Sequence, residues 1–546
     1  MKLSAVKSQN TSTQALFILA LFFSLVFLFL PHTMVGVNTF DEGFIASGAM
    51  LVRDGQLPYR DFLSVYGPAQ YYLTAAIYSV LGEDLQYMRL LHVVILSAIG
   101  VSIYLICKIA GNSNSLSLII FLCYAGIVLF AQPSVGYPAV TATLFLLLSS
   151  FGLVKWFDTF RAAPLVVASV LVGIAGLFRW DFGVFGLMAI TLTTVIAIMK
   201  EARETDLPGS PPYWLLVSNL PGILILAAVY AVFLFVLSDP VRWYHEILVY
   251  SLTELSEWRG TKFVRPAIWG LMQSRDAIDF GRSVLKLAYL GVPIALIVSA
   301  IGTAAYVFFR QDLVSEDRRR FILIIYLSFT SLLLLNQMRV RPHVWQGFSA
   351  LAASLPLIPL LYSYHKDMVI GNRLLSIPIK TSAFILGALL LSSGLNSLIK
   401  SFDESLVQLA TPRTNGVRVP QNQQSYIELI RYVENNTELN EPIFSGVVDH
   451  TRLFVNDAAL YFLARRYPAD RFLELEPGIS NTAQGQNEIV NALKRKNVRL
   501  IVLKDIVGYE ANRTSTSNGI TLLDEFIRAN YHLEKRFGKY LVFLKN

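Results

Sequence analysis

The sequence is poor in charged residues and has almost no cysteine. Only 15% of its 546 residues are charged and 54% are hydrophobic, whereas a soluble domain usually carries about 25% charged residues. Most of the surface therefore does not face water. The two cysteines, Cys107 and Cys123, lie in or beside apolar stretches. A single pair provides neither a disulfide framework nor the ligand spacing of a zinc site.

Long apolar runs predict a polytopic α-helical membrane protein, because about 20 apolar residues cross a bilayer. The first run, from Ala15 to Leu30, ends at Pro31 without a small-residue cleavage site, so we expect a retained span and not a signal peptide. The charged Arg179 and Asp181 divide the apolar region 163–199, which as one helix would run about 55 Å. About eleven spans are predicted, the others near 88–107, 115–131, 138–154, 163–178, 182–199, 213–238, 285–309, 321–336, 344–363 and 378–398.

The basic loops predict the orientation. The net charge of +8 could indicate nucleic-acid binding, but basic cytoplasmic loops are the first explanation in a membrane protein. We expect no nucleic-acid partner. With the N-terminus in the cytoplasm, every second loop is basic; these loops contain Lys108, Lys155, Arg161, Lys200, Arg203, Arg310, Arg318, Arg319, Arg320, Lys366 and Arg373. An odd number of spans then places the C-terminal end and the long loops 32–87 and 239–284 outside a cell membrane, most simply the plasma or inner membrane.

A change in composition near Ser401 predicts two domains, a membrane domain of residues 1–400 and an extracytoplasmic domain of residues 401–546. Charges return in the second domain, and helical segments alternate with the strand patterns 442–448 and 498–503, which indicates a small α/β layer domain. It has no glycine-rich phosphate loop and no nucleophile elbow. We expect a lid or docking module and not a second catalytic centre.

An acidic pair, Asp41 and Glu42, follows the first span directly and stands at the start of a short helix. A carboxylate is stabilised there by the helix dipole and the free backbone N–H groups. It can also serve as a base whose pKa is raised by desolvation. A turn with Arg60 and Asp61 comes next, and Tyr66-Gly67-Pro68 then leads into an aromatic-rich helix.

This arrangement over residues 38–83 resembles the first extracytoplasmic loop of the GT-C superfamily of glycosyltransferases. It is most similar to the branch of protein O-mannosyltransferases and lipid A aminoarabinose transferases. The resemblance implies transfer of a sugar, with inversion, from a polyprenyl-phosphate donor to a protein, glycolipid or polysaccharide acceptor at the outer face of the bilayer. It also implies that Asp41 is the general base and that Glu42 orients the base or the sugar.

Positive charge is needed for the phosphate that leaves in such a reaction. Two outer sites break the rule that basic residues stay inside: Arg179 between two spans, and Arg339, Arg341 and His343 beyond the ninth span. A guanidinium fork suits phosphate oxygens. The alternatives are contact with lipid headgroups or a simple pair between Arg179 and Asp181.

The loop 239–284 carries His245, Glu246 and Lys262 among aromatic residues. This pattern is typical of a helix lying along the membrane, and the alternative is contact with the donor or acceptor sugar. His245 and Glu246 are adjacent and point in different directions on a helix, which disfavours a metal site. No metal ligand set is predicted, although a divalent cation remains open as a cofactor.

Other functions are considered beside the glycosyltransferase. A transporter or flippase of lipid-linked sugars would bury polar residues in mid-span, where this sequence is cleanly apolar. A polysaccharide polymerase or ligase would use outer arginines but is not expected to carry the acidic pair after the first span. A non-catalytic membrane scaffold is the remaining alternative.

Overall fold

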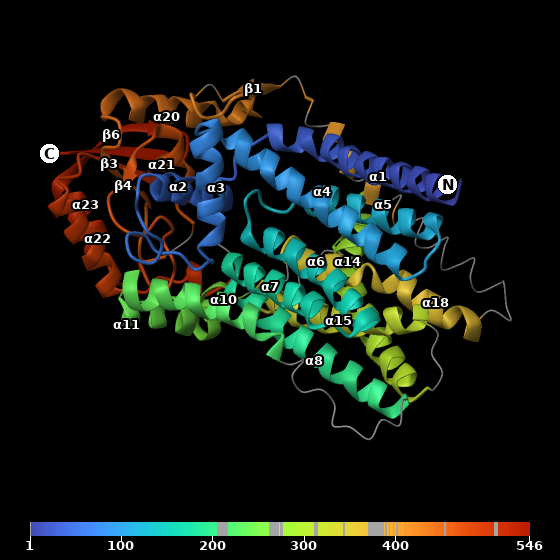
Figure 1. The fold of residues 1–546 in the computed structure, drawn as a ribbon. Helices are drawn as coiled ribbons and strands as arrows, with labels where there is room; N and C mark the ends of the chain where they lie inside the picture. Colours follow the sequence, from blue (N-terminus) through green and yellow to red (C-terminus); the bar gives the residue numbers. More distant parts are fainter. Residues whose placement is uncertain are drawn as a thin grey trace.

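The computed structural model describes residues 2–204, 217–237, 239–260, 272–273, 277–310, 315–341, 344–369, 411–452, 455–506 and 512–546, with scattered positions between 387 and 409. It shows a multi-pass helical membrane protein with a C-terminal sheet (Figure 1). Lys262 and His343 lie outside the described residues.

Helices occupy the predicted spans. Eight described helices are long and apolar enough to cross a bilayer, and two shorter apolar helices, Ala162–Phe178 and Phe348–Tyr364, fall on two further predicted spans. The predicted span 378–398 lies mostly outside the described residues. The helices of this region are α1 (Lys2–Phe29), α4 (Leu85–Ile109), α5 (Asn114–Ala131), α6 (Pro138–Thr159), α7 (Ala162–Phe178), α8 (Trp180–Glu204), α10 (Leu220–Ala231) with the π-helix η2 (Val232–Leu237), α14 (Ala277–Phe309), α15 (Ser315–Leu334), α17 (Phe348–Ser354) and α18 (Leu357–Val369).

The basic loops meet at one end of the bundle. Arg319 Nε donates to Asp158 Oδ1 over 2.9 Å, Arg320 Nε donates to the Ala110 carbonyl over 2.7 Å, and Lys200 donates to the Arg310 carbonyl. The C-terminal sheet lies at the opposite end (Figure 1). The predicted division of the loops into two sets therefore corresponds to two ends of the molecule, and the cytoplasmic assignment of the basic end stays a prediction.

The end of the bundle that faces the sheet is built from short elements between the spans. They are η1 (Leu30–Met34), α2 (Asp41–Arg53), α3 (Ala69–Leu81), α11 (Pro240–Trp243), the π-helix η3 (Tyr244–Glu254), α12 (Leu255–Arg259) and α16 (Asn336–Val340). The span α4, which follows α3, begins at a polar cap: the Asp84 side chain accepts the backbone N–H of Gln86.

A five-stranded mixed sheet forms the C-terminal α/β unit, in the order β4-β3-β5-β7-β6. Strands β3 and β5 are parallel, and β5 pairs antiparallel with β7. The strands are β3 (Pro442–Val447), β4 (Tyr467–Pro468), β5 (Leu500–Lys504), β6 (Tyr531–Phe537) and β7 (Tyr540–Lys545), with α20 (Gln424–Asn436), α21 (Ala459–Ala464), α22 (Ala483–Arg495), α23 (Leu522–Asn530), η4 (Gln421–Gln423) and η5 (Arg513–Ser515) around them and a separate pair β1 (Leu406–Gln408) and β2 (Arg418–Pro420). The hairpin β6–β7 is a feature that the sequence did not predict.

Helix α2 is docked directly on α21 of the C-terminal unit (Figure 1). The Thr39 carbonyl accepts the backbone N–H groups of Ala458 and Ala459, and Ser47 Oγ donates to the Ala458 carbonyl over 2.7 Å. Buried residues of α2, α3, α20 and α21 belong to one hydrophobic cluster. The first outer loop is thus held by the C-terminal unit, which positions the acidic pair.

Candidate active site

Asp41 occupies the first turn of α2 and is 7% exposed. Asn38 begins this turn by accepting the backbone N–H groups of Phe40 and Asp41 on its side-chain oxygen, over 3.0 and 3.1 Å. The Asp41 Oδ2 atom accepts a hydrogen bond of 2.9 Å from Ser134 Oγ and a longer one of 3.4 Å from Asn38 Nδ2. One carboxylate oxygen is therefore fixed by neighbours, and the carboxyl is oriented.

Burial is the largest influence on the Asp41 carboxyl and raises its pKa above the ordinary value. The hydrogen bonds from Ser134 and Asn38 act in the opposite direction, as do the positive charges of Arg259 and Arg341. The raised pKa makes the Asp41 carboxylate a stronger base than the carboxylate of an exposed aspartate.

Asp41 lines a cavity of about 390 Å³ at the end of the bundle, between the spans and the C-terminal unit. The predicted residues Tyr66, Arg179, Asp181, Arg339 and Arg341 line the same cavity. They come from separate outer loops, and the fold brings them together. Two predicted groups, the base and the outer arginines, therefore share one site.

The pair Arg179–Asp181 is one wall of this cavity. Arg179 donates from Nε to Asp181 Oδ1 over 3.0 Å and from Nη2 to Oδ2 over 2.7 Å, so the guanidinium grips the carboxylate with two bonds. Its Nη1 donates to the Tyr137 hydroxyl over 2.8 Å. The alternative that Arg179 pairs with Asp181 is thus observed, and the pair still faces the cavity.

A second charged wall comes from residues that the sequence analysis missed. Arg259, at the end of α12, contacts Glu474 Oε1 at 2.6 Å and Glu476 Oε2 at 3.1 Å, both from the C-terminal unit. Burial, followed by the charge of Glu476, raises the pKa of Glu474. These carboxylates lie more than 400 residues after Asp41 in a segment without regular structure, so no local pattern pointed to them.

Arg339 and Arg341, at the end of α16, line the same cavity, and Arg341 lies beside Arg259. Arg339 Nε donates to the Asn336 side-chain oxygen over 3.2 Å, and Arg341 Nε donates to the Arg259 carbonyl over 3.5 Å. The charge of Arg341 is close enough to Asp41 to act on its pKa. An anion in the cavity would thus meet guanidinium groups on more than one side.

Glu42 faces away from this cavity. It is 1% exposed and binds Arg89 of α4 with two bonds, at 2.5 Å from Nε to Oε1 and at 2.8 Å from Nη2 to Oε2. Arg89 also donates to the carbonyls of Thr33 and Gly36. The pair ties α2 to α4, and Glu42 does not line the cavity of Asp41, so its role in orienting the base or the sugar stays a prediction.

Four of the remaining predicted residues are not brought to the cavity. Arg60 and Asp61 pair with each other at 2.6 Å on the surface. His245 and Glu246 line a separate cavity of about 400 Å³ beside α22. Both Glu246 oxygens accept from Arg471, a residue of the C-terminal unit. These four side chains lie away from the cavity that Asp41 lines, and their contact with a sugar stays a prediction.

The contacts of Glu246 disfavour a metal site at His245 and Glu246. Glu246 is already neutralised by Arg471, and a carboxylate held in that way is a poor cation ligand. Within the described part of the chain, no group of three or more His, Cys, Asp or Glu side chains is placed to hold a metal ion.

Comparison with known proteins gives structural neighbours but no sequence relatives. No protein-family model matches the chain, and no curated protein matches it. An oligosaccharyltransferase of Archaeoglobus fulgidus, solved with zinc and sulfate, has a TM-score of 0.46 at 13% identity over 89% of this chain and 68% of that one. ArnT of Cupriavidus metallidurans has a TM-score of 0.38 bound to undecaprenyl phosphate and 0.43 in the apo state, both at 12% identity, over 97% and 98% of this chain and 98% of ArnT.

All of these TM-scores lie below 0.5, at identities of 12 and 13%. Likeness this distant does not carry a reaction from one protein to another. The function of this chain is therefore derived from its own site.

Proposed function

We propose that this protein is an inverting glycosyltransferase that moves a sugar from a polyprenyl-phosphate donor to an acceptor hydroxyl at the membrane surface. One observation carries the proposal: the buried carboxyl of Asp41 and the guanidinium groups of Arg179, Arg339 and Arg341 line the same cavity. That combination supplies a base for the nucleophile and positive charge for a leaving phosphate.

Asp41 would remove the proton from the acceptor hydroxyl as the new glycosidic bond forms. A hydroxyl is a weak nucleophile, and a carboxylate within hydrogen-bond reach activates it. The raised pKa of Asp41 makes it a stronger base than an exposed aspartate. Ser134 and Asn38 hold the carboxyl in place, so less orientation has to be gained during the reaction.

The arginines would bind the phosphate of the donor and stabilise its charge as the bond to the sugar breaks. Phosphate is a good leaving group, so positive charge is required more than a strong acid. Arg339 and Arg341 lie on the cavity wall with forked donors that match phosphate oxygens. Hydrogen bonds to Asp181 and Tyr137 hold the Arg179 guanidinium in place, so it would contribute a fixed positive charge to the cavity wall.

The setting of the cavity fits a donor that carries a lipid chain. Its lining includes Val184 and Phe185 of α8, a membrane span, as well as Glu474 and Glu476 of the C-terminal unit. A polyprenyl chain would remain among the spans while its phosphate reaches the arginines. We propose on this basis the domains 1–400 and 401–546, with the second outside the membrane as a lid over the site.

The alternative of a flippase is less well supported. In the described spans, the buried charged side chains are Arg89, Asp181 and Lys200, and each lies near an end of its helix. A transport pathway would place such groups near the bilayer centre. The position of charge at the rim favours chemistry at the membrane surface.

The test compares wild type with Asp41→Asn in lipid nanodiscs, using radiolabelled polyprenyl-phosphate sugars and membrane extract as the acceptor source. We expect transfer by the wild type and a loss of roughly 100-fold or more in the variant. Arg499→Gln is the control, because Arg499 pairs with Glu441 on the surface of the C-terminal unit. Equal transfer by Asp41→Asn would exclude Asp41 as the base. Absence of transfer from every donor by folded wild type would favour the flippase.

A further inference from the structure

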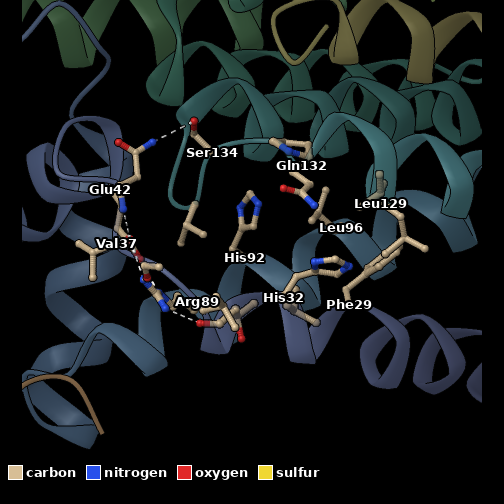
Figure 2. A pocket seen from close by; sticks show the side chains of 18 residues that line it. Phe29, His32, Val37, Glu42, Arg89, His92, Leu96, Leu129, Gln132 and Ser134 are labelled. Carbon is tan, nitrogen blue, oxygen red and sulfur yellow. Dashed lines mark hydrogen bonds and ion pairs between the residues drawn. The ribbon is translucent and has the colours of Figure 1, made fainter. Parts of the chain in front are cut away.

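A second cavity of about 320 Å³ lies beside the first turn of α2, at Glu42 (Figure 2). One half of its wall is apolar and comes from the spans α1, α4 and α5, with Phe29, Val93, Leu96, Val128 and Leu129. The other half is polar, with His32, His92, Gln132, Asn38 and Ser134. The wall is thus complementary to a lipid molecule, with an apolar part on the spans and a polar part at the rim. We call it the histidine cavity.

His92 is the most informative residue of the histidine cavity. It is 5% exposed, it hydrogen-bonds to the Pro133 backbone, and its Nε2 atom has no hydrogen-bond partner. Figure 2 shows its ring projecting from α4 toward Gln132 and Ser134. The Nε2 atom of His32 is likewise buried without a partner. Buried polar atoms are normally hydrogen-bonded, so two such nitrogens on one cavity indicate a ligand that bonds to them.

The charge of the histidine cavity selects the chemical class of that ligand. Its charged lining residues among those described are Glu42 and Arg89, which bind each other with two bonds. The Arg89 guanidinium is also occupied by the carbonyls of Thr33 and Gly36. The cavity therefore offers neutral hydrogen-bonding groups instead of the cationic groups that surround Asp41, and it suits an uncharged, hydroxyl-bearing headgroup.

The two cavities meet at the Asp41 carboxylate. Ser134 and Asn38 line the histidine cavity, and both donate to Asp41 Oδ2. Asp41 itself lines the cavity of about 390 Å³ described above with Arg179, Arg339 and Arg341, which we call the arginine cavity. A hydroxyl that displaces the Ser134 Oγ atom from Oδ2 would lie in hydrogen-bond reach of the base. The geometry thus gives a ligand of the histidine cavity direct access to the base.

We propose that the histidine cavity binds the acceptor, through the uncharged hydroxyl-bearing head of a lipid-anchored molecule. This inference rests on the proposed glycosyltransferase function and adds to it the class of the acceptor. In the step, the acceptor O–H bond breaks and its proton passes to Asp41. The acceptor oxygen forms a bond to the anomeric carbon, and the bond from that carbon to the phosphate oxygen breaks. The phosphate leaves with the electron pair, beside the arginines.

The experiment uses two photoreactive probes with wild-type protein in nanodiscs, a diazirine-bearing alkyl glucoside and a diazirine-bearing farnesyl phosphate. Crosslinked peptides are mapped by mass spectrometry. We expect the glucoside to label residues 29–37 and 128–135, and the phosphate to label residues 336–346. Labelling of the histidine cavity by the phosphate in preference to the glucoside would overturn the proposal.

A matched pair of variants at His92 tests the role of its Nε2 atom. In His92→Gln the side-chain amide can replace Nε2, and in His92→Asn it can replace only the nitrogen that contacts Pro133. We expect His92→Asn to weaken glucoside labelling, and to raise the KM for a hydroxylated lipid acceptor, by about tenfold, the effect of one lost buried hydrogen bond. His92→Gln should retain both, and the KM for the donor should not change in either variant.

Two outcomes separate this inference from the proposed function. Glucoside labelling that is equal in wild type and His92→Asn would exclude the histidine cavity as the acceptor site and leave the glycosyltransferase proposal intact. Failure of the phosphate probe to label residues 336–346 in wild type, with normal glucoside labelling, would contradict the donor site instead.

Discussion

Asp41 and Glu42 are neighbours in the chain, yet their carboxylates face different cavities. Asp41 lines the arginine cavity, and its Oδ2 atom accepts a hydrogen bond of 2.9 Å from Ser134 Oγ. Glu42 lines the histidine cavity, where Arg89 Nε binds its Oε1 atom at 2.5 Å. Successive side chains on a helix point about 100° apart, so an adjacent pair divides between two faces. The Asp41 carboxylate is thus accessible to substrate, whereas the Glu42 carboxylate forms an ion pair with Arg89 that holds α2 in position.

The raised pKa of Asp41 predicts how stability depends on pH. The folded state binds this proton more tightly than the unfolded state, whose pKa is near the ordinary 3.8. The stability that results is fully present below pH 3.8 and is lost as the pH rises through the higher folded value. At neutral pH the buried carboxylate therefore costs free energy, and Asp41→Asn should raise Tm by roughly 1–3 °C.

Thermal unfolding in nanodiscs at pH 4 and pH 7.5 measures this difference, which should shrink at the lower pH. Asp505→Asn is the control, because Asp505 is an exposed partner of Arg536. A lower Tm for Asp41→Asn at neutral pH would mean that the charged form is stabilised in the fold, contrary to the raised pKa. The transfer rate of wild type should rise with pH through the same ionisation.

Arg341→Gln and Arg339→Gln should weaken donor use. Each removes a positive charge from the cavity that Asp41 lines. We expect kcat/KM for the donor to fall by about 10- to 100-fold, as for loss of a charge-assisted contact of roughly 1.5–3 kcal/mol. The KM for the acceptor should change little. Steady-state kinetics with each substrate varied in turn would show the split, and unchanged donor kinetics in both variants would remove the phosphate role.

Glu42→Gln should destabilise the protein strongly. It leaves Arg89, which is 2% exposed, without its carboxylate, and breaking one side of a buried pair costs about 3–5 kcal/mol. Glu441→Gln is the matched control, since its partner Arg499 is exposed and surface pairs contribute only about 0–1 kcal/mol. Thermal melts of both variants measure the two losses of stability, and the loss should be much larger for Glu42→Gln. Full stability of Glu42→Gln would contradict a structural role for the pair.

Gly43→Ala should separate α2 from the C-terminal unit. A Cβ atom at Gly43 would lie 2.3 Å from the Ala459 nitrogen, so the two helices would have to move apart. We expect a loss of roughly 1–3 kcal/mol and slower transfer, because Asp41 lies in the same turn. In Gly291→Ala of α14 the new atom meets nothing within 4 Å, and a gain of up to about 1 kcal/mol is expected from helix propensity. Equal stability of the two variants would exclude close docking of α2.

The sequence by itself determined the membrane architecture and the position of the acidic pair. Runs of about 20 apolar residues specify spans because backbone groups in lipid must bond within their own helix. The alternation of helices and strands after Ser401 likewise indicated the α/β unit, since periodicity is a local property. Asp41 was singled out because it follows the first span directly, and the outer arginines because basic residues usually lie on the cytoplasmic side.

Only the tertiary structure decided which of these groups meet. Arg259 reaches Glu474 and Glu476 across more than 200 residues, and the division of the acidic pair between two cavities follows from the packing of α2 between α4 and α21. The same packing left Arg60 and His245 outside the arginine cavity. Such contacts depend on how distant elements pack, and spacing along the chain carries no information about them.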